Sequence, residues 1–323
     1  MTYDVSRRSL LALGAGLGAT TLLGGSALAK APKLGTQSPY FHRFILGSAE
    51  VTVVSDGPLP LGPPKGTFVG VPDDEVRKML SDNFLSPDNV VLEQNSPIVN
   101  TGDKLVLFDT GMGTSQMFGP TTGRQQKSMS EAGIKPEDID AVVLSHAHVD
   151  HIGGIVDSSG KVLFPNAQFY MAQSDFDFWT DEGKLGGAMK DFVIHARKNL
   201  LPVRDRLVFF KDGQEFLPGV QAMAAPGHTV GHHMFMVTSD GKSFAFLGDL
   251  THHAVLLLEK PLMEFSYDTD PKQAAQSRVK MLTMLAANKT PVMSYHFAWP
   301  GYGHVAKAGD GFHYYPEPMN MNL

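Results

Sequence analysis

Three histidines and one aspartate occupy six consecutive positions of this sequence, in the stretch HAHVDH. Imidazole nitrogens and carboxylate oxygens are common ligands of divalent metal ions. Residues two apart in an extended chain project to the same side, so His146 and His148 can face one ion, while Asp150 and His151, beyond a turn, can face a second. A single histidine is more often an ordinary surface or core residue, but three in six positions favour a metal site.

Five apolar runs with the composition of β-strands each end at a residue that can bind a metal. The runs are LVLFD, VVLSH, AMAAPGH, AFLGD and VMSYH, and they end at Asp109, His146, His228, Asp249 and His296. A sheet edge suits a metal site because the strands fix the ligands while the loops beyond them shape a pocket. We therefore expect these five residues to gather at one edge of a sheet. The chain has no cysteine, so the ligands are nitrogen and oxygen atoms, which suit zinc, manganese, iron or cobalt.

Strand-like and helix-like segments alternate along the rest of the chain. FILGSAEVTVVSDG reads as a strand entering a turn, while GRQQKSMSEAGI and PKQAAQSRVKMLTMLAAN read as helices. No internal repeat or linker of biased composition interrupts this pattern, which predicts a single layered α/β domain over residues 30–323. The Pro/Gly-rich segment 57–72 is predicted to be a loop, either lying over a pocket or simply connecting two elements.

The first 29 residues have the layout of a twin-arginine-type signal peptide. Arg7 and Arg8 precede a Gly/Ala/Leu run that ends in the small-residue pattern Ala27-Leu28-Ala29. The run is shorter than the ~20 apolar residues of a membrane span, so we expect a periplasmic or secreted protein with no stable span in its mature form. The absence of cysteine fits an oxidising compartment. The net charge of -6 argues against a nucleic-acid partner.

The HxHxDH stretch, with PGHT, GDL and a late histidine downstream, resembles the metallo-β-lactamase superfamily. That resemblance implies an αββα sandwich, in which two mixed sheets are flanked by helices, and a centre of two divalent metal ions, zinc first among them. It also implies a ligand for each position of the motifs. One ion would be bound by His146, His148 and His228, the other by Asp150, His151 and His296, with Asp249 bridging both and Asp109 orienting the ligands.

The implied chemistry is hydrolysis by a metal-bound hydroxide, with the metal-binding carboxylates Asp150 and Asp249 as catalytic residues. Differences from the motifs of other superfamily members exclude some of the reactions that this superfamily catalyses. The absence of cysteine excludes β-lactamases with a cysteine ligand, and a bridging Asp249 argues against the remaining class. His148 stands where flavodiiron proteins carry a glutamate, which argues against redox chemistry.

Longer stretches resemble the methyl parathion hydrolases and their lactonase and aryl-esterase relatives, among them LFPNAQFYMAQSDFDFW and SYHFAWPGYGHVAKAGDGFHYYP. This resemblance implies that Phe118 and Trp179 line an aromatic substrate pocket, although core packing is the ordinary role of large aromatics. The segment TDEGKLGGAMKDF offers no clean match for a third aromatic, which argues against efficient organophosphate hydrolysis. His252 and His253 follow the bridging aspartate. Either His252 or His253 lines the pocket and bonds to a substrate oxygen, or the pair faces solvent.

Together these observations predict a dinuclear metal-dependent hydrolase of small lactones or aryl esters, with phosphotriester hydrolysis as a side activity. The same ligands also allow a phosphodiesterase or a thioesterase like glyoxalase II. A third hypothesis is a metal-binding or sensing protein without turnover. A homodimer, common among the relatives, stays open.

Overall fold

The computed structural model describes residues 33–320. The segment interpreted as a signal peptide lies outside the described residues, so its role in export stays a prediction. Within the described part of the chain, no helix combines the length and the apolar character that crossing a membrane requires.

Two seven-stranded sheets form the centre of the fold from residue 39 onward. The first has the order β1 (Phe41–Leu46), β2 (Ala49–Ser55), β6 (Asn95–Asn100), β7 (Leu105–Phe108), β8 (Ala141–Val143), β9 (Gln168–Ala172) and β10 (Leu207–Phe210). The second has the order β11 (Glu215–Leu217), β12 (Val220–Ala224), β13 (His233–Ser239), β14 (Lys242–Phe246), β16 (Val292–Met293), β17 (Tyr302–Ala308) and β18 (Gly311–Pro316). Both sheets are mixed, because β7 to β10 pair in parallel, as do β14 and β16, while the other neighbours are antiparallel.

The segment predicted as one strand, FILGSAEVTVVSDG, is instead a hairpin of β1 and β2. The chain turns at Gly47, which has φ +60° and where a Cβ would lie 2.1 Å from the carbonyl oxygen of Ser239. Only glycine fits such a position without strain. The alternating pattern correctly predicts extended chain, but Gly47 divides the segment into two strands, which the prediction of one strand did not include.

Side chains that alternate along the central strands fill the layers of the sandwich. In β7, Val106 and Phe108 face the core between the two sheets, while Leu107 faces the outer core of the first sheet. In β13, Phe235 faces the same central core and Met234 the outer core of the second sheet. Burying each large apolar side chain contributes about 1.5–3 kcal/mol, so the pattern stabilises two sheets packed face to face.

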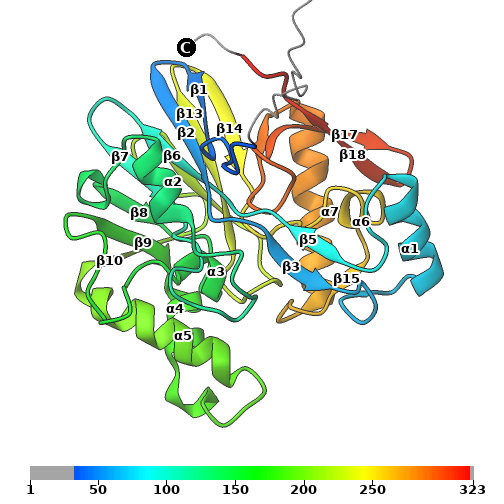
Figure 1. Ribbon diagram of the computed structural model, residues 1–323, viewed down its shortest axis with the longest axis horizontal. Helices are drawn as coiled ribbons and strands as arrows, with labels where there is room; N and C mark the ends of the chain where they lie inside the picture. The colour runs from blue at the N-terminus through cyan, green and yellow to red at the C-terminus, as the bar shows by residue number, and fades with distance from the viewer. Residues whose placement is uncertain (1–32, 321–323) are drawn as a thin grey trace, which may run out of the picture. The chain divides into compact units, whose positions relative to one another are not determined.

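Helices cover both outer faces, as Figure 1 shows. The first sheet is covered by α2 (Gln125–Glu131), α4 (Gln173–Thr180) and α5 (Lys190–Leu200), and the second by α7 (Pro271–Asn288). The short 3₁₀ turns are Pro136–Asp138, Glu182–Lys184 and Leu201–Arg206. The predicted αββα sandwich is therefore confirmed. The helix predicted from PKQAAQSRVKMLTMLAAN matches α7, which begins after the side-chain cap of Asp270 and ends at Lys289 in a left-handed conformation.

A smaller layer packs beside one end of the sandwich. It contains β3 (Leu59–Gly62) paired with β5 (Val90–Leu92), β4 (Phe68–Val69) paired with β15 (Glu264–Phe265), and the helices α1 (Asp73–Asp82) and α6 (Leu256–Glu259). The Pro/Gly-rich segment thus contains two short strands, each in a two-stranded sheet where proline is tolerated.

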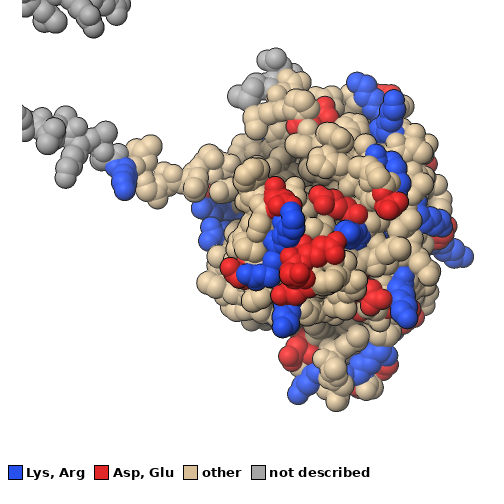
Figure 2. Space-filling view, turned by 90° about the vertical axis from the view of Figure 1, so that its right-hand side faces the viewer, with Lys and Arg blue, Asp and Glu red and all other residues tan. Residues whose placement is uncertain are grey.

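Figure 2, viewed from the side of α1, shows acidic and basic side chains interspersed. On α1, Glu75 pairs with Lys260 at 2.7 Å and Lys78 pairs with Asp82 at 2.5 Å.

Candidate metal centre

The five strand-end residues meet at one end of the sandwich, but they come from both sheets. Asp109 follows β7 and His146 lies three residues beyond β8, in the first sheet. His228, Asp249 and His296 follow β12, β14 and β16, in the second. The prediction of a single sheet edge was therefore too simple: the site lies where the ends of the two sheets meet.

The HAHVDH stretch changes conformation at its midpoint. His148 is extended, with φ -75° and ψ 153°, and is followed by the short helix α3 (Val149–Ile152), which carries Asp150 and His151. Gly153 and Gly154 then pass so close to the loop after β7 that a Cβ would lie 2.3 and 2.0 Å from carbonyl oxygens of that loop. These contacts hold α3 against the loop that contains Asp109.

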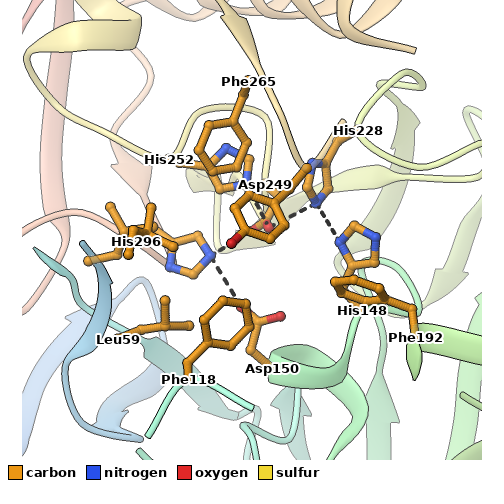
Figure 3. A pocket seen from close by; sticks show the side chains of 13 residues that line it. Leu59, Phe118, His148, Asp150, Phe192, His228, Asp249, His252, Phe265 and His296 are labelled. Carbon is orange, nitrogen blue, oxygen red and sulfur yellow. Dashed lines mark hydrogen bonds and ion pairs between the residues drawn. The ribbon is translucent and has the colours of Figure 1, made fainter. Parts of the chain in front are cut away.

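One cluster of candidate ligands consists of His146, His148, His228 and Asp249, whose ligand atoms all lie within 4.8 Å of one another. Nε2 of His228 is 2.9 Å from Nδ1 of His148, 3.1 Å from Nε2 of His146 and 3.1 Å from Oδ2 of Asp249. All four side chains are buried. Figure 3 shows His148 and His228 converging beside Asp249.

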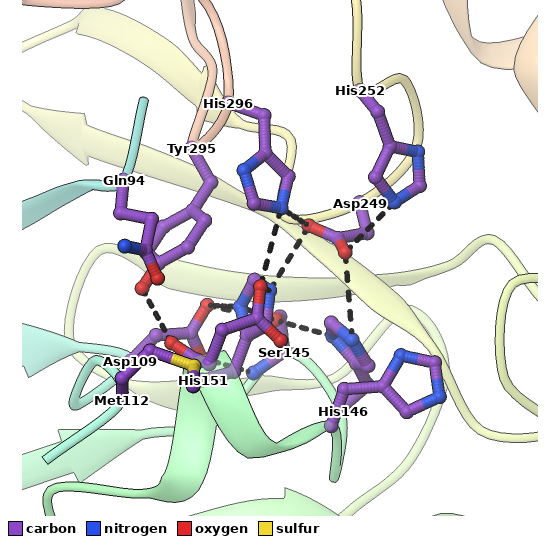
Figure 4. A network of polar contacts seen from close by, with 12 residues as sticks. Gln94, Asp109, Met112, Ser145, His146, His151, Asp249, His252, Tyr295 and His296 are labelled. Carbon is purple, nitrogen blue, oxygen red and sulfur yellow. Dashed lines mark hydrogen bonds and ion pairs between the residues drawn. The ribbon is translucent and has the colours of Figure 1, made fainter. Parts of the chain in front are cut away.

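A second cluster consists of Asp150, His151, Asp249 and His296, again within 4.8 Å. Oδ1 of Asp249 lies 3.1 Å from Nε2 of His151 and 3.2 Å from Nε2 of His296. Asp249 thus turns Oδ2 to the first cluster and Oδ1 to the second (Figures 3 and 4). A carboxylate in this position can bridge two ions.

The chemistry of the donors fits two divalent ions. Nε2 of His151 and Oδ1 of Asp249 are buried and lie 3.1 Å apart, but neither makes a hydrogen bond to a described residue. A buried polar atom without a hydrogen bond is costly unless something else binds it. Burial lowers the pKa of His146 and His148 well below 6.5, which leaves neutral imidazoles with lone pairs to donate. Burial opposes ionisation of Asp249, but the facing His151 and His296 outweigh it and hold its pKa well below 3.8.

Asp109 orients the histidines from behind. Its Oδ2 is 2.8 Å from Nδ1 of His151 and also accepts the hydroxyl hydrogen of Ser145, which lies 3.0 Å from Nδ1 of His146 (Figure 4). Asp109 has φ +58°, an unfavourable conformation for a residue with a Cβ. His296 is fixed in the same way by the carbonyl oxygen of Glu93, at 2.8 Å.

Two buried aspartates that the sequence analysis missed tie the loops of the site together. Asp56 accepts hydrogen bonds from the backbone N–H groups of residues 112, 123 and 125, and Asp175 from those of residues 147 and 231. Burial raises the pKa of both carboxyls to about 6, and these hydrogen bonds limit the increase. Asp56 follows a strand in VVSDG, the same signal that identified Asp109, so it could have been found.

His228 has a further partner that the sequence did not indicate. Its Nδ1 lies 2.8 Å from Oδ1 of Asp268, in the segment between β15 and α7. An acidic residue just before a helix is usually interpreted as a cap, and that role belongs to Asp270.

A pocket opens directly onto both clusters (Figure 3). Besides the clustered residues it is lined by Leu59, Leu61, Leu92, Phe118, Phe192, His252, Phe265 and Tyr267. The Pro/Gly-rich segment therefore contributes to the pocket wall through Leu59 and Leu61. Among the lining residues that the structure describes, none is a lysine or an arginine.

The aromatic predictions are partly corrected. Phe118 lines the pocket, but Trp179 does not: it is 1% exposed and packs in the outer core, with its ring 5.0 Å from that of His148. Phe192, the last residue of the segment that seemed to lack a third aromatic, lines the pocket, with its ring 5.1 Å from that of His148 and 6.0 Å from that of Trp179. The helix α5 brings Phe192 there, which a comparison of loop lengths could not reveal.

The two histidines after Asp249, His252 and His253, have different surroundings. His252 lines the pocket, and its ring lies between those of Phe265 and His296, at 4.1 and 5.2 Å. His253 is buried away from the pocket, and its Nδ1 accepts the backbone N–H groups of Val255 and Leu256 at the start of α6. Of the two histidines, His252 therefore lines the pocket, whereas His253 neither lines it nor faces solvent, which corrects the expectation for His253.

Comparisons with known proteins identify a family and several relatives of this chain. The model of the Metallo-beta-lactamase superfamily matches residues 90–294. N-acyl homoserine lactonase from Bacillus cereus is 24% identical over 255 residues, which cover 72% of this chain and 90% of that protein. The solved structure of AidC, a dizinc quorum-quenching lactonase with a bound product, is 32% identical with a TM-score of 0.81 and covers 88% of this chain and 99% of its own. AbOPH, a hydrolase in the beta-lactamase superfamily, is 26% identical with a TM-score of 0.81 and covers 88% and 100%.

Proposed function

We propose that this chain, which belongs to the metallo-β-lactamase superfamily, is a dinuclear metal-dependent hydrolase of small, neutral lactones or aryl esters. The observation that carries the proposal is a pocket with a largely apolar wall, whose described lining residues include no lysine or arginine, and which opens directly onto two clusters of candidate metal ligands. The lactonases among its relatives support the same reaction class.

The ligand roles follow from the two clusters. We assign His146, His148 and His228 to one ion, Asp150, His151 and His296 to the other, and Asp249 to both. Zinc is the first candidate, because the similar AidC is a dizinc enzyme. When bound, two such cations lower the pKa of a water molecule towards ~7 and polarise a carbonyl or phosphoryl oxygen.

The pocket wall favours a neutral substrate. The side chains that surround the ligands are mostly aliphatic and aromatic, including Leu59, Phe118 and Phe192. An anionic group brought into such surroundings loses several kcal/mol of hydration unless a cation pairs with it. Beyond the candidate metal site, the described lining residues include no lysine or arginine to pair with the carboxylates of a glutathione thioester. A lactone or an aryl ester has no such charge. A phosphotriester is also neutral, so we retain phosphotriester hydrolysis as a proposed side activity.

Two polar groups in the wall can contact such a substrate. The hydroxyl of Tyr267 makes no hydrogen bond to another described residue. Burial, together with the charge of Asp150, raises the pKa of Tyr267 above 10, so the phenol remains a proton-bearing donor at neutral pH. We propose that this O–H donates to a substrate oxygen, and that His252 holds Asp249 in place.

A panel of substrates tests the proposal on zinc-loaded and manganese-loaded protein. We expect kcat/KM for dihydrocoumarin, an N-acyl homoserine lactone or p-nitrophenyl acetate to exceed that for a glutathione thioester and for bis-p-nitrophenyl phosphate by at least about 100-fold. Faster turnover of either anionic substrate would favour the thioesterase or phosphodiesterase alternative. Absence of turnover in protein that binds two ions per chain would favour a binding or sensing role.

His148→Ala and Asp249→Ala are the variants that test the metal assignment. His148 belongs to one cluster and Asp249 to both. We expect His148→Ala to lower the affinity for one ion, Asp249→Ala to lower it for both, and each to abolish turnover. Retained activity in either variant, with its metal content measured, contradicts the assignment.

A further inference from the structure

We infer that Asp268 and Arg278 form a buried pair that positions His228 as a metal ligand and sets the affinity of the first cluster for its ion. The inference rests on the proposed function, because it concerns the same metal site. It assigns a role to two residues that neither contact the pocket nor belong to a ligand cluster.

The first step is the contact between Asp268 and His228. Oδ1 of Asp268 lies 2.8 Å from Nδ1 of His228, and Nε2 of the same ring faces Nδ1 of His148 at 2.9 Å. A ring N–H donated to a carboxylate fixes the tautomer and leaves the other nitrogen as the lone-pair donor. Asp268 therefore sets both the direction and the basicity of His228.

The backbone reinforces this contact. The N–H of Thr269 donates to the carbonyl of His228 at 2.9 Å, and the N–H of Asp270 donates to that of Gly227 at 2.8 Å. Gly227 has φ +125°, and a Cβ there would lie 2.1 Å from the nitrogen of Ala274 in α7. The turn that carries His228 is therefore packed directly against the start of α7.

The second step is the contact between Arg278, on α7, and Asp268. Arg278 is 1% exposed, and its guanidinium donates to the carbonyl oxygens of Leu250, Pro261 and Met263 at 2.8–3.1 Å. These three bonds hold its Nη2 3.8 Å from Oδ2 of Asp268, a buried oxygen without a hydrogen-bond partner. Burial lowers the pKa of Arg278 only to about 10, so it is charged at neutral pH.

The consequence is a line of contacts from Arg278 through Asp268 to His228. A buried carboxylate without a cation nearby is strongly disfavoured, so the Arg278 guanidinium, 3.8 Å away, offsets the cost of burying Asp268 next to the ring. Carboxylates behind a metal-binding histidine typically contribute 10–100-fold to metal affinity.

The experiment measures metal binding by the full chain, with activity as a second readout. Zinc affinities are determined by competition with a chromophoric chelator. In cobalt-loaded protein, the shifted ring N–H proton resonances of the ligating histidines report which ion is affected. We expect Asp268→Asn to weaken the ion bound by His228 by about 10–100-fold and to leave the other ion unchanged. Lys280→Gln, which removes an exposed positive charge from the same helix, is the matched control and should leave both affinities unchanged.

A double-mutant cycle separates positioning from a general loss of structure. Arg278→Met should weaken the same ion, but it should cause no further loss of affinity in the Asp268→Asn background, because it acts through that carboxylate. Arg278→Lys keeps the charge without the three-way hydrogen bonding and should give a smaller loss; it also serves if Arg278→Met does not fold.

Two outcomes overturn the inference. One is additive effects of the two substitutions on metal affinity, and the other is equal weakening of both ions by Asp268→Asn. Wild-type protein that binds fewer than two ions would contradict the proposed function itself. Wild-type protein with two ions, and unchanged affinities in Asp268→Asn, would contradict only the role of Asp268 and Arg278.

Discussion

Nε2 of His252 lies 3.0 Å from Oδ2 of Asp249, the oxygen that Asp249 turns towards the first cluster. Burial lowers the pKa of His252 to about 4, despite the opposing effect of Asp249, so the ring is neutral and its Nε2–H can donate to the carboxylate. The ring also stacks on that of His296 and packs at a tilt against that of Phe265. His252 therefore restrains the bridging carboxylate without belonging to either ligand cluster.

We predict that His252→Phe lowers kcat for a lactone by about 10–100-fold, the range found when a partner of a metal ligand is removed. Phenylalanine keeps the stacking but cannot donate to Asp249. Two ions should still bind, with reduced affinity, which elemental analysis and chelator competition would measure. Unchanged kcat would show that Asp249 needs no support from this ring.

The neighbouring His253 provides a matched control. Its Nδ1 accepts two backbone N–H groups at the start of α6, so His253→Ala removes a helix cap and should lower the free energy of unfolding by about 0.5–2 kcal/mol. Denaturant unfolding measures that loss. Because His253 lies outside the pocket, kcat/KM of the folded variant should stay at the wild-type value.

Metal binding should depend on pH through His228. Burial lowers the pKa of His228, but the carboxylates of Asp249 and Asp268 outweigh it and raise that pKa to about 9 in the metal-free protein, against 6.5 in an unfolded chain. The proton on His228 thus stabilises the metal-free fold fully below about pH 6.5, and this contribution disappears as the pH rises through about 9. At pH 7 the ion must displace the proton, so its affinity should increase between pH 7 and 9.

Calorimetry in buffers of different ionisation enthalpy measures this proton release directly. At pH 7 we expect at least one proton to leave the protein for the pair of ions, and the number should fall as the pH approaches 9. His151, whose pKa the surrounding carboxylates also raise despite its burial, adds to the release. Binding without proton release at pH 7 would contradict the charge balance described here.

The residues that cluster at the candidate centre were largely predictable from sequence, because closely spaced histidines and aspartates at strand ends are local signals. The HAHVDH stretch and the strand ends named the residues that the structure brings together, and the alternating apolar runs predicted the layers. The features that the sequence did not predict depend on packing between distant segments of the chain. In the sequence, Arg278 and Asp268 resemble ordinary polar residues of a helix and of the segment before it. They become partners only because α7 packs against the turn at Gly227. In the same way, only the directions of α4 and α5 in the fold determine that Phe192 lines the pocket and Trp179 does not.

Phe192 and Trp179 should respond differently to truncation. Phe192 is half-buried in the pocket wall, so Phe192→Ala should raise KM for an aryl ester more than for a small aliphatic lactone, with little change in stability. Trp179 is fully buried in the outer core, so Trp179→Ala should cost about 3–5 kcal/mol of unfolding free energy. Steady-state kinetics and denaturant unfolding of the two variants test this assignment. A specific KM effect of a conservative Trp179→Phe substitution, without loss of stability, would return Trp179 to the pocket.

Tyr267 offers the sharpest test of how a substrate is held. Its hydroxyl makes no hydrogen bond to another described residue, while its ring packs against Phe118 and Phe265 at 5.9 and 5.3 Å. Tyr267→Phe therefore removes the O–H and keeps the packing. We expect kcat/KM for a lactone to fall by about 10-fold, the value of one hydrogen bond to a polar or charged group, at unchanged metal content and stability. Tyr267→Leu, which loses the ring as well, should add an increase in KM for aryl esters. Wild-type kinetics in Tyr267→Phe would mean that the hydroxyl faces solvent in the bound complex and that the substrate oxygen is held by the metal centre alone.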